Sequence, residues 1–258
     1  MFPYSIAAIF AVAFFLNLSG LLFKKENIKT TITKLEKLSS DQKTVLYTEK
    51  GVKAIVTLPD GSIVNMNSGT KLIFPNKFDG NTREVYLSGE AFFSVKKDSL
   101  NPMVISTNKD FRISVLGTTF NLRAYENDDY ASVTLYTGRI NLERINLRTK
   151  EENIMTIKPM QSVLITSKSA PIVNVPADIN SEIAWKEGYL VFESIPMSEV
   201  IKRLERWHGT EFIVKNNNVL KIKVTANFHS ESIVQIMELL RFSTGINYEL
   251  KENKVILK

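Results

Sequence analysis

The hydrophobic pattern divides the chain into three stretches. The first 23 residues contain no charged side chain, and their centre, Ile6–Leu16, is continuously apolar. About twenty such residues in a helix span the ~30 Å hydrocarbon core of a membrane. The pattern predicts a transmembrane helix at 1–23 and a juxtamembrane linker at 24–44. A cleaved signal peptide is the alternative, although neither a basic N-terminal region nor a small-x-small site precedes Lys24.

The second stretch, 45–175, alternates apolar and polar residues in short runs. At 111–115 and 120–124, for example, every second residue is apolar. This period of two is typical of half-buried strands, and turn residues separate the runs. About a dozen short strands predict an all-β domain. The pattern leaves open whether the domain is a sandwich, a barrel or a solenoid-like roll. The phenylalanines expected in its core are Phe74, Phe92, Phe93 and Phe120.

Turn chemistry marks several positions in this stretch. Pro59-Asp60-Gly61 predicts a tight turn, because proline presets φ and Asp-Gly accepts a reversal. Gly89 interrupts a predicted strand at 84–96 and indicates a bulge or a crossing point. Gly117 predicts a place where a side chain would obstruct the backbone. Thr137-Gly138 predicts another turn.

The third stretch, 176–258, mixes helical and strand patterns. Apolar residues recur at helical spacing from Met197 to Trp207, and Gly209 follows. A second helix is expected from Ser232 to Phe242, where Ser232 and Gln235 have the spacing of a capping box, and Gly245 follows. The predicted strands are 189–192, 211–214, 221–225, 246–250 and 254–257. The resulting order β-α-β-β-α-β-β predicts a small α+β domain, able to fold by itself. The residues expected on the polar face of the first helix are Glu199, Lys202, Arg203 and Arg206.

Charge and composition narrow the function. The net charge is +6, and half of it lies between Lys24 and Lys50, beside the apolar segment. This distribution favours a solvated spacer over a nucleic-acid surface, so we expect no nucleic-acid partner. The chain has no cysteine, which excludes disulfides and thiolate metal sites.

No catalytic motif stands out. Phosphate-loop, Gly-x-Ser-x-Gly and His-Glu-x-x-His patterns are missing from the sequence. Glu205 and His208 are helical neighbours, but a helix-end histidine explains His208 better than a metal or an acid–base pair. Asp128 and Asp129 are expected in a solvated turn. We therefore predict no enzyme activity, no metal and no cofactor.

Four ordered motifs in the β stretch, and one after it, resemble a known family. They are Leu58–Gly69, Arg83–Val95, Val115–Asn121, Val133–Ile140 and Trp185–Phe192. These runs resemble FecR-type anti-sigma factors of the form typical of Bacteroidetes. The last stretch is also similar to the short signalling domain of secretins and TonB-dependent receptors. The matching motif positions are expected to be structural: Pro59, Asp60, Gly61, Gly89, Glu90, Gly117, Gly138, Trp185 and Gly188.

The resemblance implies a membrane-anchored regulator. A single-pass inner-membrane protein would hold its bulk in the periplasm. The implied partners are the signalling domain of a TonB-dependent outer-membrane receptor and an extracytoplasmic-function sigma factor. In this family a cytoplasmic segment before the span usually binds the sigma factor, so that partner is expected only if such a segment exists upstream.

Two other functions remain open. One is a periplasmic carbohydrate- or peptide-binding β protein with no role toward a sigma factor, which should expose aromatic side chains in a groove. The other is a hydrolase, which should offer a convergent polar cluster.

Overall fold

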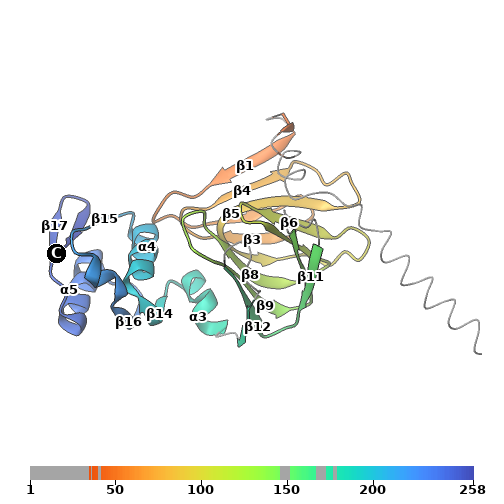
Figure 1. The fold of residues 1–258 in the computed structure, drawn as a ribbon. Coiled ribbons are helices and arrows are strands. Elements are labelled where there is room, and N and C mark those ends of the chain that lie inside the picture. The colour runs from red at the N-terminus through yellow and green to blue at the C-terminus, as the bar shows by residue number, and fades with distance from the viewer. Residues whose placement is uncertain (1–34, 36, 40–41, 146–151, 167–172, 177–178) are drawn as a thin grey trace, which may run out of the picture.

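Thirteen strands of the described residues pair into one sheet that curls around a single apolar core, almost as a barrel (Figure 1). The computed structural model describes residues 35, 37–39, 42–145, 152–166, 173–176 and 179–258. A mainly β fold is thereby confirmed. The strands are β1 (Lys43–Tyr47), β2 (Ala54–Thr57), β3 (Ile63–Met66), β4 (Lys71–Pro75), β5 (Arg83–Ser94), β6 (Met103–Thr107), β7 (Phe111–Val115), β8 (Thr119–Ala124), β9 (Ala131–Thr137), β10 (Ile140–Ile145), β11 (Glu152–Ile157), β12 (Gln161–Ile165) and β13 (Val173–Pro176).

The long strand β5 belongs to both layers of this sheet. Its first half pairs with β4 and, in parallel, with β6, whereas its second half pairs antiparallel with β3 and β8. One layer continues from β6 through β7 and β10 to β11. The other continues from β8 through β9 and β12 to β13. The change of layer falls at Gly89, the residue that the sequence marked as a bulge or crossing point.

Alternation along the strands decides which side chains enter the core. Phe93 on β5 and Phe120 on β8 are fully buried and stack with ring centroids 5.0 Å apart. Phe74 belongs to the same core, as predicted. Phe92 is also buried but lies on the opposite face of β5, where it meets Tyr136 edge-on. The predicted burial of Phe92 is confirmed, but its side chain lies outside the cluster that contains Phe93, because Phe93 occupies the inward register.

The C-terminal part contains helices and two small sheets. Its elements are α3 (Ile179–Ile183), the 3₁₀ helix η1 (Ala184–Glu187), β14 (Leu190–Pro196), α4 (Met197–His208), β15 (Glu211–Val214), the 3₁₀ helix η2 (Asn217–Lys221), β16 (Lys223–Phe228), α5 (Ile233–Thr244), β17 (Tyr248–Lys251) and β18 (Lys254–Leu257). β14 pairs with β16, while β18 lies between β15 and β17. From β14 onward the order of strands and α-helices is the predicted one. α3 has no counterpart among the elements predicted from the sequence.

Local chemistry explains where the two longer helices begin and end. Ser232 and Gln235 form the predicted capping box at the start of α5, and Gly245 ends the helix in the left-handed conformation. Gly209 ends α4 in the same way. The apolar stripes of both helices pack into a second core that is separate from the core of the β part.

The predicted membrane segment at 1–23 and most of the linker at 24–44 lie outside the described residues. In the part of the chain that the structure covers, no helix combines the length and the apolar character needed to cross a membrane.

Candidate functional site

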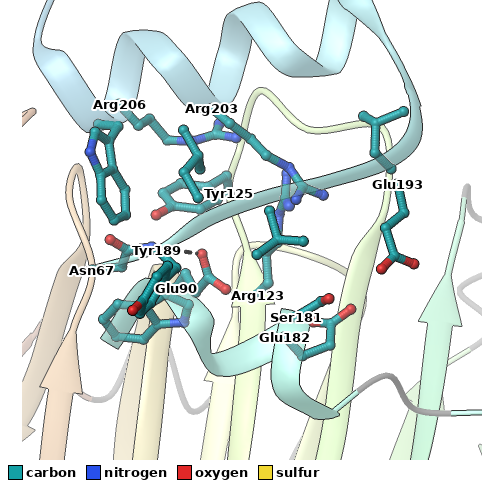
Figure 2. A pocket seen from close by; sticks show the side chains of 15 residues that line it. Asn67, Glu90, Arg123, Tyr125, Ser181, Glu182, Tyr189, Glu193, Arg203 and Arg206 are labelled. Atoms are coloured by element: carbon teal, nitrogen blue, oxygen red, sulfur yellow. Dashed lines mark hydrogen bonds between the residues drawn. The ribbon is translucent and has the colours of Figure 1, made fainter. Parts of the chain in front are cut away.

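The β part and the C-terminal part meet at a polar junction beneath α4 (Figure 2). On β8, Phe120, Leu122 and Ala124 face the core, so alternation directs Asn121 and Arg123 outward. Glu90 on β5 lies opposite Arg123 in the strand register and faces the same side. α4 lies over this face and brings its own charged side chains to it. We define the junction by these outward residues of β5 and β8, the β8–β9 loop, the β1–β2 loop, η1 and α4.

A buried network of charges joins the two parts. Arg123 donates to Asp128 from both Nε and Nη2, at 2.9 and 2.6 Å, and also forms an ion pair with Glu199 of α4. Arg206, in the last turn of α4, donates to the other oxygen of Asp128 at 2.9 Å. Arg203 pairs with Glu199 at 3.2 Å. Two carboxylates thus hold three arginines drawn from both parts.

The charges of this network stabilise one another. Burial alone would raise the pKa of Asp128, but the guanidinium groups of Arg123 and Arg206 outweigh it and hold that pKa below its usual range. Burial alone would lower the pKa of Arg123, yet the nearby Tyr130, Glu199, Glu90 and Asp128 raise it well above the usual value. Asp128 and Arg123 are therefore both charged at neutral pH.

One sequence-based expectation is wrong at this junction. The Asp128 side chain is completely buried, not solvated, although Asp129 beside it is 94% exposed. Glu199 and Arg206 lie on the polar face of α4, as predicted, and both are buried. The reason is that the polar face covers the charged outer face of β8, so each charge finds a partner without water.

The β1–β2 loop forms the second contact between the parts. The N–H of Gly51 donates to the carbonyl of Arg206 at 2.7 Å, which satisfies one of the free carbonyl groups near the end of α4. Lys53 donates to the carbonyl of Trp185 at 2.7 Å, and its ammonium lies 3.7 Å from the centroid of the Trp207 ring. Partial burial lowers the pKa of Lys53, although Glu90 opposes this effect.

Glu90 is held at the base of the junction by two amides. Asn67 and Asn121 each donate to one of its carboxylate oxygens at 2.9 Å. The indole N–H of Trp185 donates to the carbonyl oxygen of Asn121 at 3.3 Å. Two of the motif residues singled out in the sequence, Glu90 and Trp185, are therefore joined through Asn121.

A cavity of about 260 Å³ opens between the two parts at this place. Its floor is Asn67, Glu90, Arg123 and Tyr125 from the β part. α3, η1, β14 and α4 supply the other walls (Figure 2).

The other motif residues lie away from the junction, except for Gly188 at the end of η1. Asp60 accepts from the N–H and the hydroxyl of Ser62 at 2.9 and 2.7 Å, and forms an ion pair with the buried Arg83. Partial burial by itself would raise the pKa of Asp60, but these hydrogen bonds and Arg83 lower it below the usual range. Pro59 and Gly61 flank Asp60 in the same turn.

Three further motif glycines have backbone conformations that suit glycine. A Cβ on Gly117 would lie 2.7 Å from the Cα of Lys97, and one on Gly138 would lie 2.7 Å from the carbonyl oxygen of Gly117. Gly188 has a φ of 88° at the C-terminal end of η1 and lies beside His229. A side chain at Gly117 or Gly138 would therefore collide with its neighbours, which supports a structural role for these two glycines.

Sequence reasoning missed Arg123, Asp128, Glu199 and Arg206 as site residues. A faint signal existed, since Arg123 stands between apolar residues inside a strand, where a charge needs a partner. Glu205 and His208 do not form a site, because Glu205 accepts the N–H of Phe212 at 3.0 Å. No group of histidine, aspartate and glutamate residues able to hold a metal occurs in the described ranges.

The fold and the junction define a class of protein in which a curled β part and a small α+β part share one buried polar contact. The family model for the FecR protein matches residues 44–141, and that for the FecR C-terminal region matches 189–257. Crystal structures of a candidate anti-sigma factor from Parabacteroides distasonis ATCC 8503, at 1.65 and 2.50 Å resolution, are also similar. Each is 30% identical, has a TM-score of 0.75, and covers 83% of this chain and 98% of that chain. No curated protein matches at a significant level. The chain belongs to the FecR family of anti-sigma-factor-like regulators.

Proposed function

We propose that this protein is a membrane-anchored regulator that reports the occupancy of a TonB-dependent outer-membrane receptor to an extracytoplasmic-function sigma factor. In this proposal the segment 1–23 is the single inner-membrane anchor, and the residues from Lys24 onward lie in the periplasm. The regulator binds partners and converts no substrate. Sedimentation of the full chain with membranes tests the anchor, and a chain that stays in the soluble fraction would contradict it.

One observation carries the proposal. The likeness to the candidate anti-sigma factor extends over 98% of that chain and 83% of this one at 30% identity, so it includes both parts. The family matches fall on the same two parts in the same order. A likeness confined to the β part would support only a shared fold.

The surface that suits a receptor best lies on α5. Phe242 is 93% exposed, and Leu239, three residues earlier on the same helix, is half exposed. This helix lies on the side of the C-terminal part away from the β part (Figure 1). Neighbouring apolar side chains on an exposed helix face are typical of a binding surface. We propose that the receptor's signalling domain docks on this face.

Transmission of the signal requires two states of the regulator with different affinities for the receptor domain. The junction offers such an element, because its contacts are polar and the two cores that it joins are separate. Docking on the C-terminal part would favour one arrangement of the junction, and the β part would carry the difference toward the membrane. The segment that holds the sigma factor in this family precedes the membrane span.

A binding measurement tests the proposal directly. The full chain in detergent is titrated with signalling domains of TonB-dependent receptors, and Kd is measured by calorimetry. We expect one of these domains to bind and Phe242→Asp to weaken that binding at least about 30-fold, because buried aromatic anchors dominate interfaces at ~2 kcal/mol or more each. Leu100→Asp is the matched control, since Leu100 is 85% exposed on the β part, and we expect it to bind as the unmodified chain does.

Two outcomes would overturn the proposal. Failure of every receptor domain to bind would remove the receptor as a partner. Equal weakening by Phe242→Asp and Leu100→Asp would show that α5 is not the docking surface.

A further inference from the structure

The cavity at the junction holds a buried carboxylate without an ion pair. Glu90 is buried, and its carboxylate accepts hydrogen bonds from the neutral amides of Asn67 and Asn121. Within the described ranges, no lysine or arginine forms a salt bridge with it. A carboxylate can accept about four hydrogen bonds, and the two amides fill about two of these positions on Glu90, which lines the cavity. A buried charge of this kind requires further donors.

The cavity is lined by three carboxylates, Glu90, Glu182 and Glu193, and by three guanidinium groups, Arg123, Arg203 and Arg206. Arg123 and Arg206 share Asp128, and Arg123 and Arg203 share Glu199. An anionic ligand would have to compete with Asp128 and Glu199 for the arginines, and it would meet the three carboxylates of the lining. A cationic ligand would suit Glu90 but would lie among three guanidinium groups. The walls consequently favour a ligand without net charge that both donates and accepts hydrogen bonds.

One wall is apolar and aromatic. Leu190, Val191 and Ile195 of β14 line the cavity there together with Trp207 of α4. Such a surface suits the C–H face of a ring, and the volume of about 260 Å³ suits one small ring with its substituents.

We infer that the cavity binds a neutral polyhydroxylated ligand of the size of one monosaccharide unit. Hydroxyl groups would donate to Glu90 and accept from the guanidinium groups, while the ring would lie against β14 and Trp207. Because the walls come from both parts of the chain, the ligand would stabilise their contact. The inference does not rest on receptor binding, and the two can fail separately.

The test uses the full chain in a detergent without a sugar headgroup. Calorimetry measures binding of glucose, galactose, mannose and N-acetylglucosamine, with glucosamine and glucuronate as the cationic and anionic comparisons. We expect at least one neutral sugar to bind with a Kd of about 1 mM or lower. We expect the charged sugars to bind at least about tenfold more weakly, because a net charge of either sign would meet like charges in the lining of the cavity.

A cavity-filling variant locates the binding. Val191→Phe places a ring inside the cavity and should weaken binding at least about tenfold, because it occupies the volume that the ligand needs. Val191→Phe is a better test than Glu90→Gln, because the amide of a glutamine at position 90 would point an N–H donor at the amide donor of Asn67 or Asn121 and disturb the fold. Val45→Phe, on the exposed strand β1, is the matched control and should bind as the unmodified chain does.

Any of three results would overturn the inference: no neutral sugar binds with a Kd below about 10 mM, a charged sugar binds more tightly than every neutral one, or Val191→Phe binds as the control does.

Discussion

Gly89 allows β5 to pass from one layer of the sheet to the other. Its φ is 126°, and an added Cβ would lie 2.5 Å from Oγ1 and 2.7 Å from Cα of Thr70. The hydroxyl of Thr70 accepts from the N–H of Glu90 and donates to its carbonyl, at 3.0 and 3.1 Å. Gly89 thus lets Thr70 approach closely enough to fix Glu90 at the floor of the junction.

Gly89→Ala should lower the free energy of unfolding by about 3 kcal/mol, because it combines backbone strain with a clash against Thr70. Urea unfolding measures the change. Gly245→Ala is the control, since Gly245 has a φ of 73° and no atom within 4 Å of the added Cβ. It should cost about 1 kcal/mol through strain alone. Equal losses in the two variants would show that the contact with Thr70 is unimportant.

At the scale of elements, α4 connects the two parts. Its apolar stripe packs into the C-terminal core, while its polar face meets β8 and the β8–β9 loop through Glu199 and Arg206. The β1–β2 loop contacts its C-terminal end through Gly51. Since both faces are covered, α4 cannot move relative to the β part without breaking several buried ion pairs together. Because these ion pairs form and break together, the junction can hold the two parts in one arrangement or let them separate in a single step.

Asp128→Asn should lower the free energy of unfolding by about 3 kcal/mol, because it leaves Arg123 and Arg206 buried without a full counter-charge. Thermal unfolding of the full chain measures the loss. Asp129→Asn is the matched control: this carboxylate pairs with Lys202 at the surface, so its change should stay within about 0.5 kcal/mol. Similar losses in both variants would contradict a special role for Asp128.

Acidification should weaken the same contact. The pKa of Asp128 is lowered in the folded protein, so its stabilisation is complete above the unfolded pKa of about 3.9 and is lost as the pH falls through the lower folded value. Stability measured from pH 5 downward should therefore fall less steeply in Asp128→Asn than in the unmodified chain. Asp60, whose pKa is also lowered, accounts for part of the slope that remains. Identical slopes would rule out the assignment.

At the scale of the molecule, two separate cores lie on either side of one polar junction. We propose that the C-terminal part, 176–258, is an independent domain beside the β domain at 45–175. Removal of the β part would expose the charged face of α4, and water can solvate those charges. An exposed apolar face would instead destabilise the separated domain.

The fragment 184–258 should therefore fold by itself. We expect a helical circular dichroism spectrum and one cooperative thermal transition, at a lower temperature than in the full chain because the junction contacts are lost. Deletion of the same residues should leave a cooperative transition for the β part. A fragment without helical signal or without a transition would show that the two parts form one folding unit.

The sequence by itself determined the features that depend on near neighbours. Alternation placed Phe93 and Phe120 in the core, helical spacing located α4 and α5, and Ser232 with Gln235 marked the start of α5. Each of these follows from the local period of side chains or from hydrogen bonds within one turn.

Only the tertiary structure decided which polar residues meet. Arg123 and Glu199 are 76 positions apart, and Asp128 and Arg206 are 78 apart. Charge alone favours solvent exposure for each of these residues, because an isolated charged residue is most stable in water. Packing α4 against β8 gives each charge an opposite charge in place of water. The cavity above Glu90 depends on strand and helix packing in the same way, and no local pattern encodes it, whereas Gly89 marked the crossing point of β5 in the sequence.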